Sequence, residues 1–414
     1  MRPKNILVIT YWSYRDALIQ TYTAPYLKII RKYLPEGSRI FLVTLEQSRL
    51  AMSEEELRST QGELAREGLR LVPFSYSRFG LKAMLKWLVF LWRLLWLCRR
   101  ASITHIHGWC TPGGSIGYIL SKLTGRPLIV DSYEPHAEAM VENGAWTAGG
   151  LAFKILFRLE KLQSKHAAFI IATTRGMKTY AREKYGASLP RFYVKPACVD
   201  LGLFAPEEKK DAALLERYGL GGKLVCVYAG KIGGIYLERE IFDFFKVAAE
   251  YWGESFRVLL LTDASPERVT ELAQAAGLDP SIIRTQFVAH RDVPRHMGLG
   301  DFAINPVKPV PTKRYCTSIK DGEYWAMGLP VVIPPSISDD SDIILAEGAG
   351  SVIEEFNREA YLRSVREIDA MLKAYSGEEL CDKVRRVAVE YRNFSIADDI
   401  YRDIYGSHKS RDEG

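Results

Sequence analysis

Short runs of apolar residues alternate with longer amphipathic stretches along the whole chain. Continuous apolar runs separated by helical periods are typical of parallel strands that helices cover on both faces. The pattern predicts strands over 5–10, 39–44, 69–74, 103–107, 127–131, 168–172 and 192–195, then over 224–229, 257–262, 282–288, 302–305 and 330–334. Between them, segments such as 24–33 and 178–184 have helical periodicity.

The two series of strands predict two domains, because 414 residues exceed one ordinary core. Their boundary falls in the loop-like stretch that starts at Lys195-Pro196. We expect an α/β protein with two Rossmann-like, doubly wound domains, residues 1–197 and 198–385, followed by a terminal helix and tail over 386–414. Ligands of such sheets bind beyond the carboxyl ends of the strands.

The cysteines indicate a reducing compartment. All six are scattered, without a CxxC pair, so neither a disulfide framework nor a zinc site is predicted. The apolar run after Lys4 is too short for the core of a signal peptide, so we expect a cytoplasmic protein.

Charge is divided unevenly between the two halves. Residues 1–195 contain 29 Lys and Arg against 14 Asp and Glu, a net +15, and the remainder has 27 against 36, a net −9. A basic half favours an anionic partner. No zinc-finger spacing, aromatic RNP strand or basic heptad region accompanies it, so we expect a membrane surface rather than a nucleic acid.

The most hydrophobic segment is 81–98, followed by Arg99-Arg100. Lys86 and Arg93 interrupt it, and its uninterrupted runs fall short of the ~20 residues that span a bilayer. Tryptophans beside basic residues are typical of an interfacial helix, although one face of this helix could equally pack in the core. We therefore expect peripheral binding at the inner face of the membrane, through these residues: Lys86, Trp92, Arg93, Trp96, Arg99 and Arg100.

Residues 318–333 combine an amphipathic helix, a Gly-Leu-Pro turn and a short strand. Lys320 and Glu323 fall near the start of this helix, where phosphate groups are readily bound. Neither a Walker loop nor a Gly-x-Gly-x-x-Gly fingerprint is present, which disfavours ATPase and dehydrogenase activities.

The order of motifs resembles glycosyltransferase family 4, a family with the GT-B fold. The matching segments span nearly the whole chain: Ile170-Ile171-Ala172-Thr173-Thr174, Val199-Asp200 with Phe204, Tyr228-Ala229-Gly230-Lys231, Val293-Pro294, Asp301 to Pro306, and Glu323 to Val332. The resemblance implies two domains facing across a cleft and a terminal helix that crosses back onto the first.

The resemblance also implies an activity. It implies a hexosyltransferase that moves a sugar from a UDP- or GDP-linked donor to a lipid-linked or polysaccharide acceptor, with retention, in cell-surface glycan synthesis. Its front-face mechanism needs no protein nucleophile. Apart from the nucleotide sugar as co-substrate, no cofactor and no essential metal are expected, and the pairs Asp339-Asp340 and Asp398-Asp399 are expected at the surface.

The resemblance assigns Glu323 to the donor ribose and Lys231 to the leaving diphosphate, as a catalytic cation. Lys320 is either a phosphate contact or a solvated partner of Glu323. Two positions depart from the family, because Tyr315 replaces the first carboxylate and Tyr236 replaces a second cation, which Arg239 could supply. The remaining donor-site candidates are Gly230, Gly233, Thr317 and Ser318.

In the first domain, the resemblance places a sugar-contacting histidine after the fifth strand. His136 is the nearest, with Asp131 and Glu134 as competing candidates and His107 as an acceptor contact. Tyr11 and Trp12, after the first strand, are acceptor candidates or core residues.

Two other functions stay open. A nucleotide-sugar epimerase shares this fold, but it needs carboxylates around the sugar, and Tyr315 removes one. The departures at Tyr315 and Tyr236 are also compatible with a non-catalytic scaffold or binding subunit.

Overall fold

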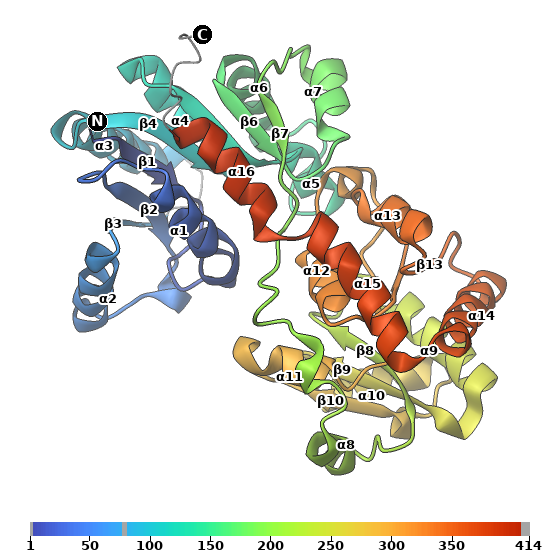
Figure 1. Cartoon of the computed structure of the whole chain (residues 1–414). Coiled ribbons are helices and arrows are strands. Elements are labelled where there is room, and N and C mark those ends of the chain that lie inside the picture. The colour runs from blue at the N-terminus through green and yellow to red at the C-terminus, as the bar shows by residue number, and fades with distance from the viewer. Residues whose placement is uncertain (1–2, 77–80, 407–414) are drawn as a thin grey trace, which may run out of the picture. The chain divides into compact units, whose positions relative to one another are not determined.

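The computed structural model describes residues 3–76 and 81–406 (Figure 1). The chain forms two compact units, one of residues 1–195 and 395–414, the other of residues 196–394.

The first unit is built on a seven-stranded sheet, with the order β3-β2-β1-β4-β5-β6-β7 and every pair parallel. Its strands are β1 (Asn5–Ile9), β2 (Ile40–Glu46), β3 (Leu69–Ser75), β4 (Ile103–Trp109), β5 (Leu128–Tyr133), β6 (Phe169–Ala172) and β7 (Phe192–Val194). Its helices are α1 (Ala24–Lys32), α2 (Glu54–Arg66), α3 (Leu81–Arg100), α4 (Cys110–Thr124), α5 (His136–Glu142), α6 (Leu151–His166), α7 (Met177–Tyr185) and α16 (Phe394–Tyr405).

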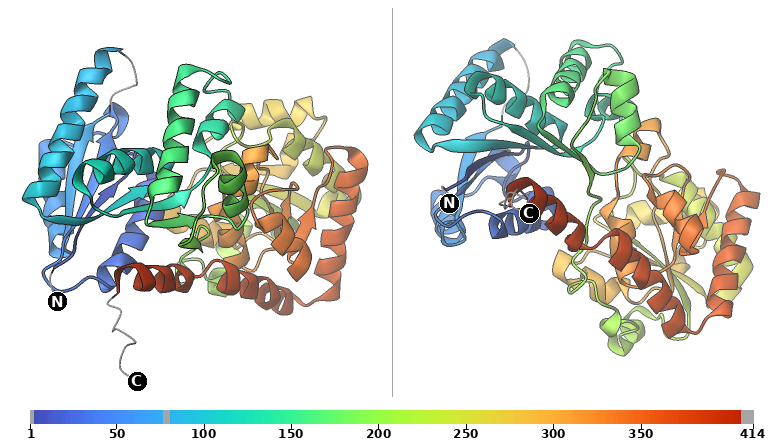
Figure 2. Two further views of the ribbon diagram at one scale, coloured as in Figure 1. Left: turned by 90° about the horizontal axis from the view of Figure 1, so that it is seen from above. Right: turned by 45° about the horizontal axis from the view of Figure 1, so that its top comes forward.

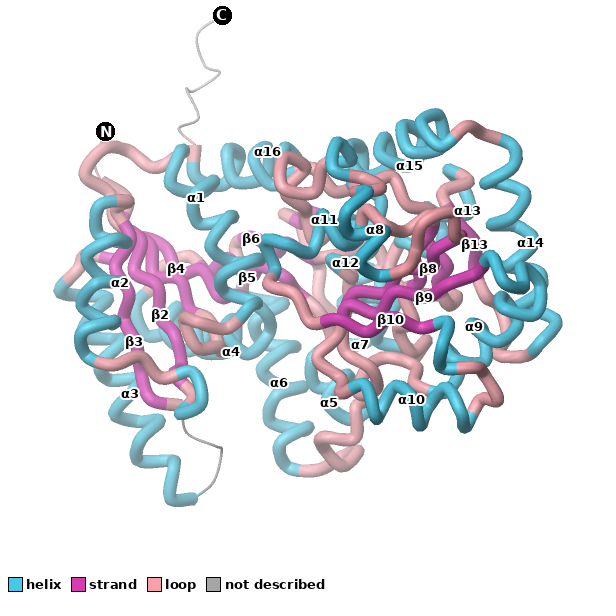
Figure 3. Tube along the Cα trace, turned by 90° about the horizontal axis from the view of Figure 1, so that it is seen from below, coloured by secondary structure: helices cyan, strands magenta, loops and turns pink. Residues whose placement is uncertain are grey.

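Strand β4 contacts helices on both faces of this sheet. On one face a Cβ at Gly108 would lie 2.4 Å from Gly114 Cα, so α4 approaches the strand more closely than any side chain would permit. On the other face, Trp109 packs against Tyr26 of α1, and His107 stacks on Tyr405 of α16. Helices α3, α4 and α6 follow one another along the α4 face (Figure 3).

The second unit has a six-stranded parallel sheet with the order β10-β9-β8-β11-β12-β13. Its strands are β8 (Leu224–Ala229), β9 (Phe256–Leu261), β10 (Ile283–Gln286), β11 (Phe302–Ile304), β12 (Val331–Ile333) and β13 (Gly350–Val352). Its helices are α8 (Ala212–Tyr218), α9 (Arg239–Trp252), α10 (Pro266–Ala275), α11 (Val293–Met297), α12 (Ile319–Ala326), α13 (Asp340–Glu347), α14 (Arg358–Ala374) and α15 (Gly377–Tyr391).

Successive residues of these strands enter different apolar layers. Val227 of β8 packs on the α12 and α15 side, and Tyr228 packs on the α9 and α14 side. Both faces of the sheet are therefore buried, which is why its strands are apolar throughout.

The predicted α/β class with two Rossmann-like sheets is confirmed, and all twelve predicted strands are present. The thirteenth strand, β13, was missed because its sequence, Gly-Ser-Val, is too short and too polar to read as a strand. The predicted boundary at residue 386 falls inside α15, whose Leu380, Val384 and Ala388 pack in the core of the second unit. The predicted tail, 407–414, lies outside the described residues.

Candidate functional site

A glycine-rich turn follows β8 at the carboxyl edge of the second sheet. Gly230 has φ +157°, and a Cβ there would lie 2.5 Å from Lys320 Cε and 2.9 Å from Tyr228 Oη. Gly233 and Gly234 follow with φ +80° and +66°, in the left-handed region that glycine tolerates. Position 230 favours glycine because its φ is strained for any other residue, and because the ends of the Lys320 and Tyr228 side chains already occupy the space beside it.

Helix α12 brings Lys320 to this turn. Its Nζ donates a hydrogen bond to Tyr236 Oη at 2.6 Å and lies 4.4 Å from the centre of that ring. The amide of Ala229 donates to Tyr324 Oη at 2.9 Å, which fixes α12 to the end of β8. Lys320 is thus bound to Tyr236, and the alternative that it pairs with Glu323 does not hold in the structure.

Glu323 is nearly buried, with 8% of its surface exposed. Its Oε1 lies 3.9 Å from His290 Nε2, and this interaction raises the pKa of His290. His290 was missed in the sequence, although it precedes the Val293-Pro294 motif by only three residues. A carboxylate held at the edge of a sheet with one half-exposed partner is suited to accept hydrogen bonds from ligand hydroxyls.

A buried acidic cluster lies under α12. Asp321 accepts a hydrogen bond from Asn305 Nδ2 at 2.7 Å, and Asp340 is paired with Arg392. Burial, and then the nearby Asp340 carboxylate, raise the pKa of Asp321 well above its usual range. Asp340 was expected at the surface, but it is 1% exposed because Arg392 draws it inward. This cluster sets the position of the helix that carries Lys320 and Glu323.

The other donor candidates lie around the same edge. Ser318, the N-cap of α12, accepts a hydrogen bond from Asn305 at 3.0 Å, and Thr317 precedes it half-buried. Lys231 is exposed in the glycine turn. Arg239 is 79% exposed at the start of α9, where it pairs with Asp243 at 3.6 Å, so the structure directs it along its own helix.

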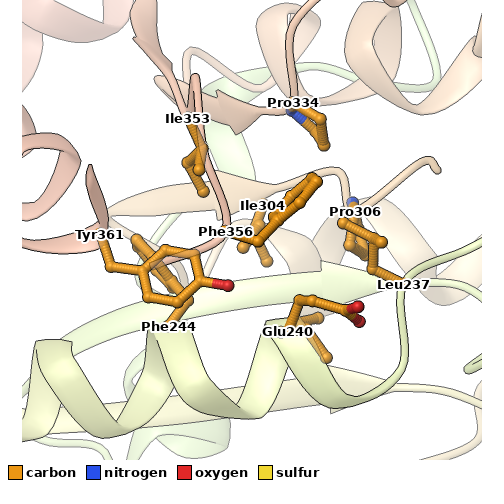
Figure 4. A pocket seen from close by; sticks show the side chains of 10 residues that line it. Leu237, Glu240, Phe244, Ile304, Pro306, Pro334, Ile353, Phe356 and Tyr361 are labelled. Carbon is orange, nitrogen blue, oxygen red and sulfur yellow. The ribbon is translucent and has the colours of Figure 1, made fainter. Parts of the chain in front are cut away.

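A small apolar cavity lies at the same edge, between α9 and the ends of β11 and β13 (Figure 4). Its volume is about 10 Å³, and Leu237, Phe244, Ile304 and Phe356 are among its lining residues. That volume is roughly what one water molecule requires, so the cavity is not a sugar site.

In the first unit, Asp131 and His107 are fully buried. Asp131 accepts from Tyr401 Oη at 2.6 Å and lies 3.2 Å from His107 Nε2, while His107 Nδ1 is 2.7 Å from Tyr405 Oη. Asp131 was predicted as a catalytic residue and His107 as an acceptor contact, but the structure buries both side chains away from any ligand. Both side chains are saturated by neighbours inside the unit, and they hold α16.

Lys195 completes this interior cluster. Its ammonium lies 3.1 Å from Asp131 Oδ1 and 3.5 Å from the centre of the Tyr26 ring. Burial alone would raise the pKa of Asp131, but Lys195, then His107 and Tyr401, outweigh it and lower the pKa to about 2. Lys195 was predicted only as a domain boundary, because its partners are remote in sequence.

His136 and its neighbour Glu134 are the candidates of this group that are partly exposed. His136 begins α5, its side chain is 26% exposed, and Nδ1 lies 3.6 Å from Glu134 Oε1. The backbone just before it is unusual, since Ser132 has φ +49° and the register with β6 shifts between Val130 and Tyr133. Such strain concentrates at functional sites.

Tyr11 and Trp12 lie in the turn after β1, both half-buried. Tyr11 makes an edge-to-face contact with Tyr76 at 5.9 Å, and burial raises its pKa. The carbonyl of Trp12 accepts from the amide of Leu45 at 3.0 Å.

Helix α3 exposes the residues predicted to meet a membrane. Trp92 is 65% and Trp96 48% exposed, and Lys86, Arg93, Arg99 and Arg100 are exposed beside them. Arg100 lies over the Trp96 ring at 4.8 Å. Across residues 3–76 and 81–406, none of the helices is both long and apolar enough to cross a bilayer.

Metal ligands do not gather in the described part of the chain. No group of three or more His, Cys, Asp and Glu side chains there is placed to hold an ion.

Residues 26–197 match the family model described as a glycosyl transferase 4-like domain. This segment is therefore similar to glycosyl transferase 4-like domains. It comprises most of the first unit, from α1 through β7. The resemblance to family-4 glycosyltransferases is thereby confirmed.

Two curated relatives are glycosyltransferases. The chain is 26% identical over 262 residues to the D-inositol 3-phosphate glycosyltransferase of Xylanimonas cellulosilytica, covering 59% of this chain and 60% of that protein. It is 26% identical over 231 residues to the alpha-D-kanosaminyltransferase of Streptomyces kanamyceticus, covering 51% and 57%. The chain thus matches less than two thirds of either relative.

The fold extends beyond the glycosyl transferase 4-like domain. The crystal structure of Anabaena HepE in complex with UDP aligns with a TM-score of 0.71 at 13% identity, over 97% of this chain and 99% of that one. The match covers both units, so the GT-B fold is confirmed for the whole chain.

Proposed function

We propose that this protein is a glycosyltransferase that moves a hexose from a nucleotide-diphosphate sugar to a lipid-linked or polysaccharide acceptor. The observation that carries the proposal is the carboxyl edge of the second sheet, where α12 brings Lys320 against the Gly230 turn and carries Glu323 about one helical turn further on. A glycine turn admits a diphosphate to the backbone, and a nearby ammonium stabilises the charge that develops as the sugar departs. The carboxylate of Glu323 binds the ribose hydroxyls.

The chemistry requires positioning and charge stabilisation more than a protein nucleophile. We propose transfer with retention of the anomeric configuration and without an essential metal. Lys231 and Lys320 neutralise the leaving diphosphate. In the first unit, His136 is our proposed sugar contact. We place the protein in cell-surface glycan synthesis, in the cytoplasm at the inner face of the membrane.

The UDP complex of HepE, which has the same fold, supports a uridine-linked donor, and a GDP-linked donor is the alternative. A thermal-shift panel of UDP and GDP sugars identifies it. A ligand present at 100 times its dissociation constant stabilises the folded protein by about 2.7 kcal/mol.

The test of the site is Glu323→Gln, which keeps the size of the side chain and removes its charge. We expect the variant to lose about tenfold or more in donor affinity, because hydrogen bonds to a charged group contribute about 1.5–3 kcal/mol. Glu254→Gln is the matched control, since Glu254 is fully exposed just before β9, at the amino ends of the strands of the same sheet. Equal donor affinity in the two variants would reject the assigned site.

Transfer itself is tested by supplying the identified donor with a membrane lipid extract, with and without EDTA. Labelled sugar in the lipid fraction in both conditions is expected. Donor binding without transfer would favour the non-catalytic alternative, and conversion of the donor to an isomer without acceptor would favour the epimerase.

A further inference from the structure

A groove with a volume of about 400 Å³ opens beside α3 in the first unit. Its walls come from the carboxyl ends of two strands, Leu45 of β2 and Phe74 and Ser75 of β3, and from α3, which contributes Phe90. Pockets for small ligands generally measure about 300–1,000 Å³, so the groove is large enough to hold one.

The interior of the groove is apolar and well ordered by packing. Phe74 and Phe90 meet edge to face at 4.7 Å, and Trp87 packs on Phe90 at 5.3 Å in the same geometry. Leu45 is 3% and Phe90 7% exposed, so they form a floor. Aromatic and aliphatic side chains arranged in this way suit a hydrocarbon chain.

Two cations, Lys86 and Arg93, are part of the lining. They are seven residues apart on α3, two turns along one face of the helix. Helix α3 contains no Asp or Glu, and neither do the described residues that line the groove. The charge of the site therefore complements a ligand with one anionic group and an apolar body.

The outer surface of α3 indicates where such a ligand would come from. Leu85, Leu88 and Trp92 are 70%, 57% and 65% exposed, far more apolar surface on one helix than an ordinary water-facing helix shows. Helix α6 similarly exposes Leu151 (76%), and the first turns of α3 and α6 project past the sheet on the same side (Figures 2 and 3). Apolar side chains exposed near the starts of two helices on the same side of the sheet, with basic residues on α3, favour a lipid surface.

We propose that the groove binds one phosphorylated lipid, with its chain against Phe74 and Phe90 and its phosphate between Lys86 and Arg93. Phosphate and ammonium or guanidinium groups form charge-assisted hydrogen bonds, which are the strong ones. If the groove binds the acceptor of the proposed sugar transfer, that acceptor is an anionic lipid. This assignment rests on the proposed function. Lipid binding itself does not depend on transfer.

The probe is dihexanoyl phosphatidylglycerol below its micelle concentration, titrated by calorimetry without donor. Glycerol 3-phosphate and inorganic phosphate are the comparison ligands, since they carry the anion without the chains. We expect saturable binding of the lipid at one site and at least about tenfold weaker binding of both comparison ligands. Equal affinity for inorganic phosphate would show an anion site only and overturn the proposal.

Variants separate the contribution of the groove from that of the general positive charge of the first unit. Ser75→Trp fills the exposed rim without changing charge, and K86E/R93E reverses the two cations of the groove. Both are expected to weaken lipid binding about tenfold or more. The control is R58E/R66E, an equal charge change on the exposed face of α2 in the same unit and outside the groove, with binding within about threefold of wild type. Equal losses in the control and in K86E/R93E would overturn the groove, as would no binding to the wild type.

The two proposals fail in distinguishable ways. If the short-chain lipid does not bind but sugar transfer to extracted lipid proceeds, the groove is wrong and the function stands. If the lipid binds and no nucleotide sugar stabilises the protein, the function is wrong and the groove stands.

Discussion

At the residue scale, one buried carboxyl group next to the loop after β5 makes the stability of the first unit depend on pH. Glu160 of α6 is fully buried, and its carboxyl accepts from the amide of Ala137 at 2.8 Å and from Tyr185 Oη at 2.9 Å. Burial raises its pKa to about 8, and Glu134 and Glu138 add to the shift. The protonated form is therefore the one that the first unit stabilises.

The sign of the pH dependence follows. Between about pH 4.5 and 8 the folded chain holds this proton and the unfolded chain does not, so the free energy of unfolding falls as pH rises through that window. We expect Glu160→Gln to remove this contribution, at most about 1.4 kcal/mol per pH unit. Urea unfolding at pH 5, 6.5 and 8 measures it. Glu183→Gln on the exposed face of α7 is the control, and a Glu160→Gln slope equal to the control's would contradict the prediction.

The residues that sequence analysis misplaced have one physical cause in common. Asp131 and His107 end predicted strands, which is where ligand-binding groups usually lie, but Tyr401 and Tyr405 cover them. Those partners are 270 and 298 residues away in the sequence, so the residues around Asp131 and His107 could not predict these contacts. Lys320 and Glu323 do lie on a helix as predicted, because helix, turn and strand are contiguous in the sequence there.

At the element scale, α16 is fastened to the first unit by polar contacts at several points. Tyr401 donates to Asp131, Asp398 accepts from Tyr33 and Lys32, and Asp403 accepts from Tyr193. The Asp131 contact is the buried one, with Lys195 opposite. It joins the last helix to the strand that leads to His136.

Removal of one hydroxyl tests this attachment. We expect Tyr401→Phe to destabilise the first unit by about 1–3 kcal/mol, because it leaves a buried carboxylate short of a donor. Arg402→Ala, on the exposed side of α16 next to Asp399, is expected to cost less than about 0.5 kcal/mol. Hydrogen exchange of α16 reports the difference. Similar exchange in the two variants would mean that the buried bond does not hold the helix.

Elements were predictable from the sequence wherever an apolar run and a helical period alternated, which holds for every strand except β13. Strand β13 forms because it pairs with β12, not because its own sequence favours a strand. A Cβ at Gly350 would lie 2.0 Å from the carbonyl oxygen of Val331, so glycine is required by the neighbouring strand rather than by local propensity. Such information is present only in the folded sheet.

At the scale of the whole molecule, charge and apolar exposure coincide in the first unit. Residues 1–195 carry the net +15, and α3 within them exposes Trp92 and Trp96 beside four cations. Each basic residue near an anionic membrane contributes about 1 kcal/mol at most, and the attraction decays over ~10 Å in 0.1 M salt. Binding to a membrane should therefore depend on where the charge lies, not on the net +6.

Sedimentation with phosphatidylglycerol vesicles at rising salt distinguishes binding that depends on the location of the charge from binding that depends on net charge alone. We expect R99E/R100E to lower vesicle binding about tenfold or more at 0.1 M salt, since four units of charge change beside the exposed tryptophans. R363E/R366E makes the same change of net charge on α14 in the acidic second unit, and we expect its binding to stay near wild type. If the two variants lose binding equally, net charge alone governs it. If wild-type binding does not weaken with salt, the basic face of α3 has no part in it.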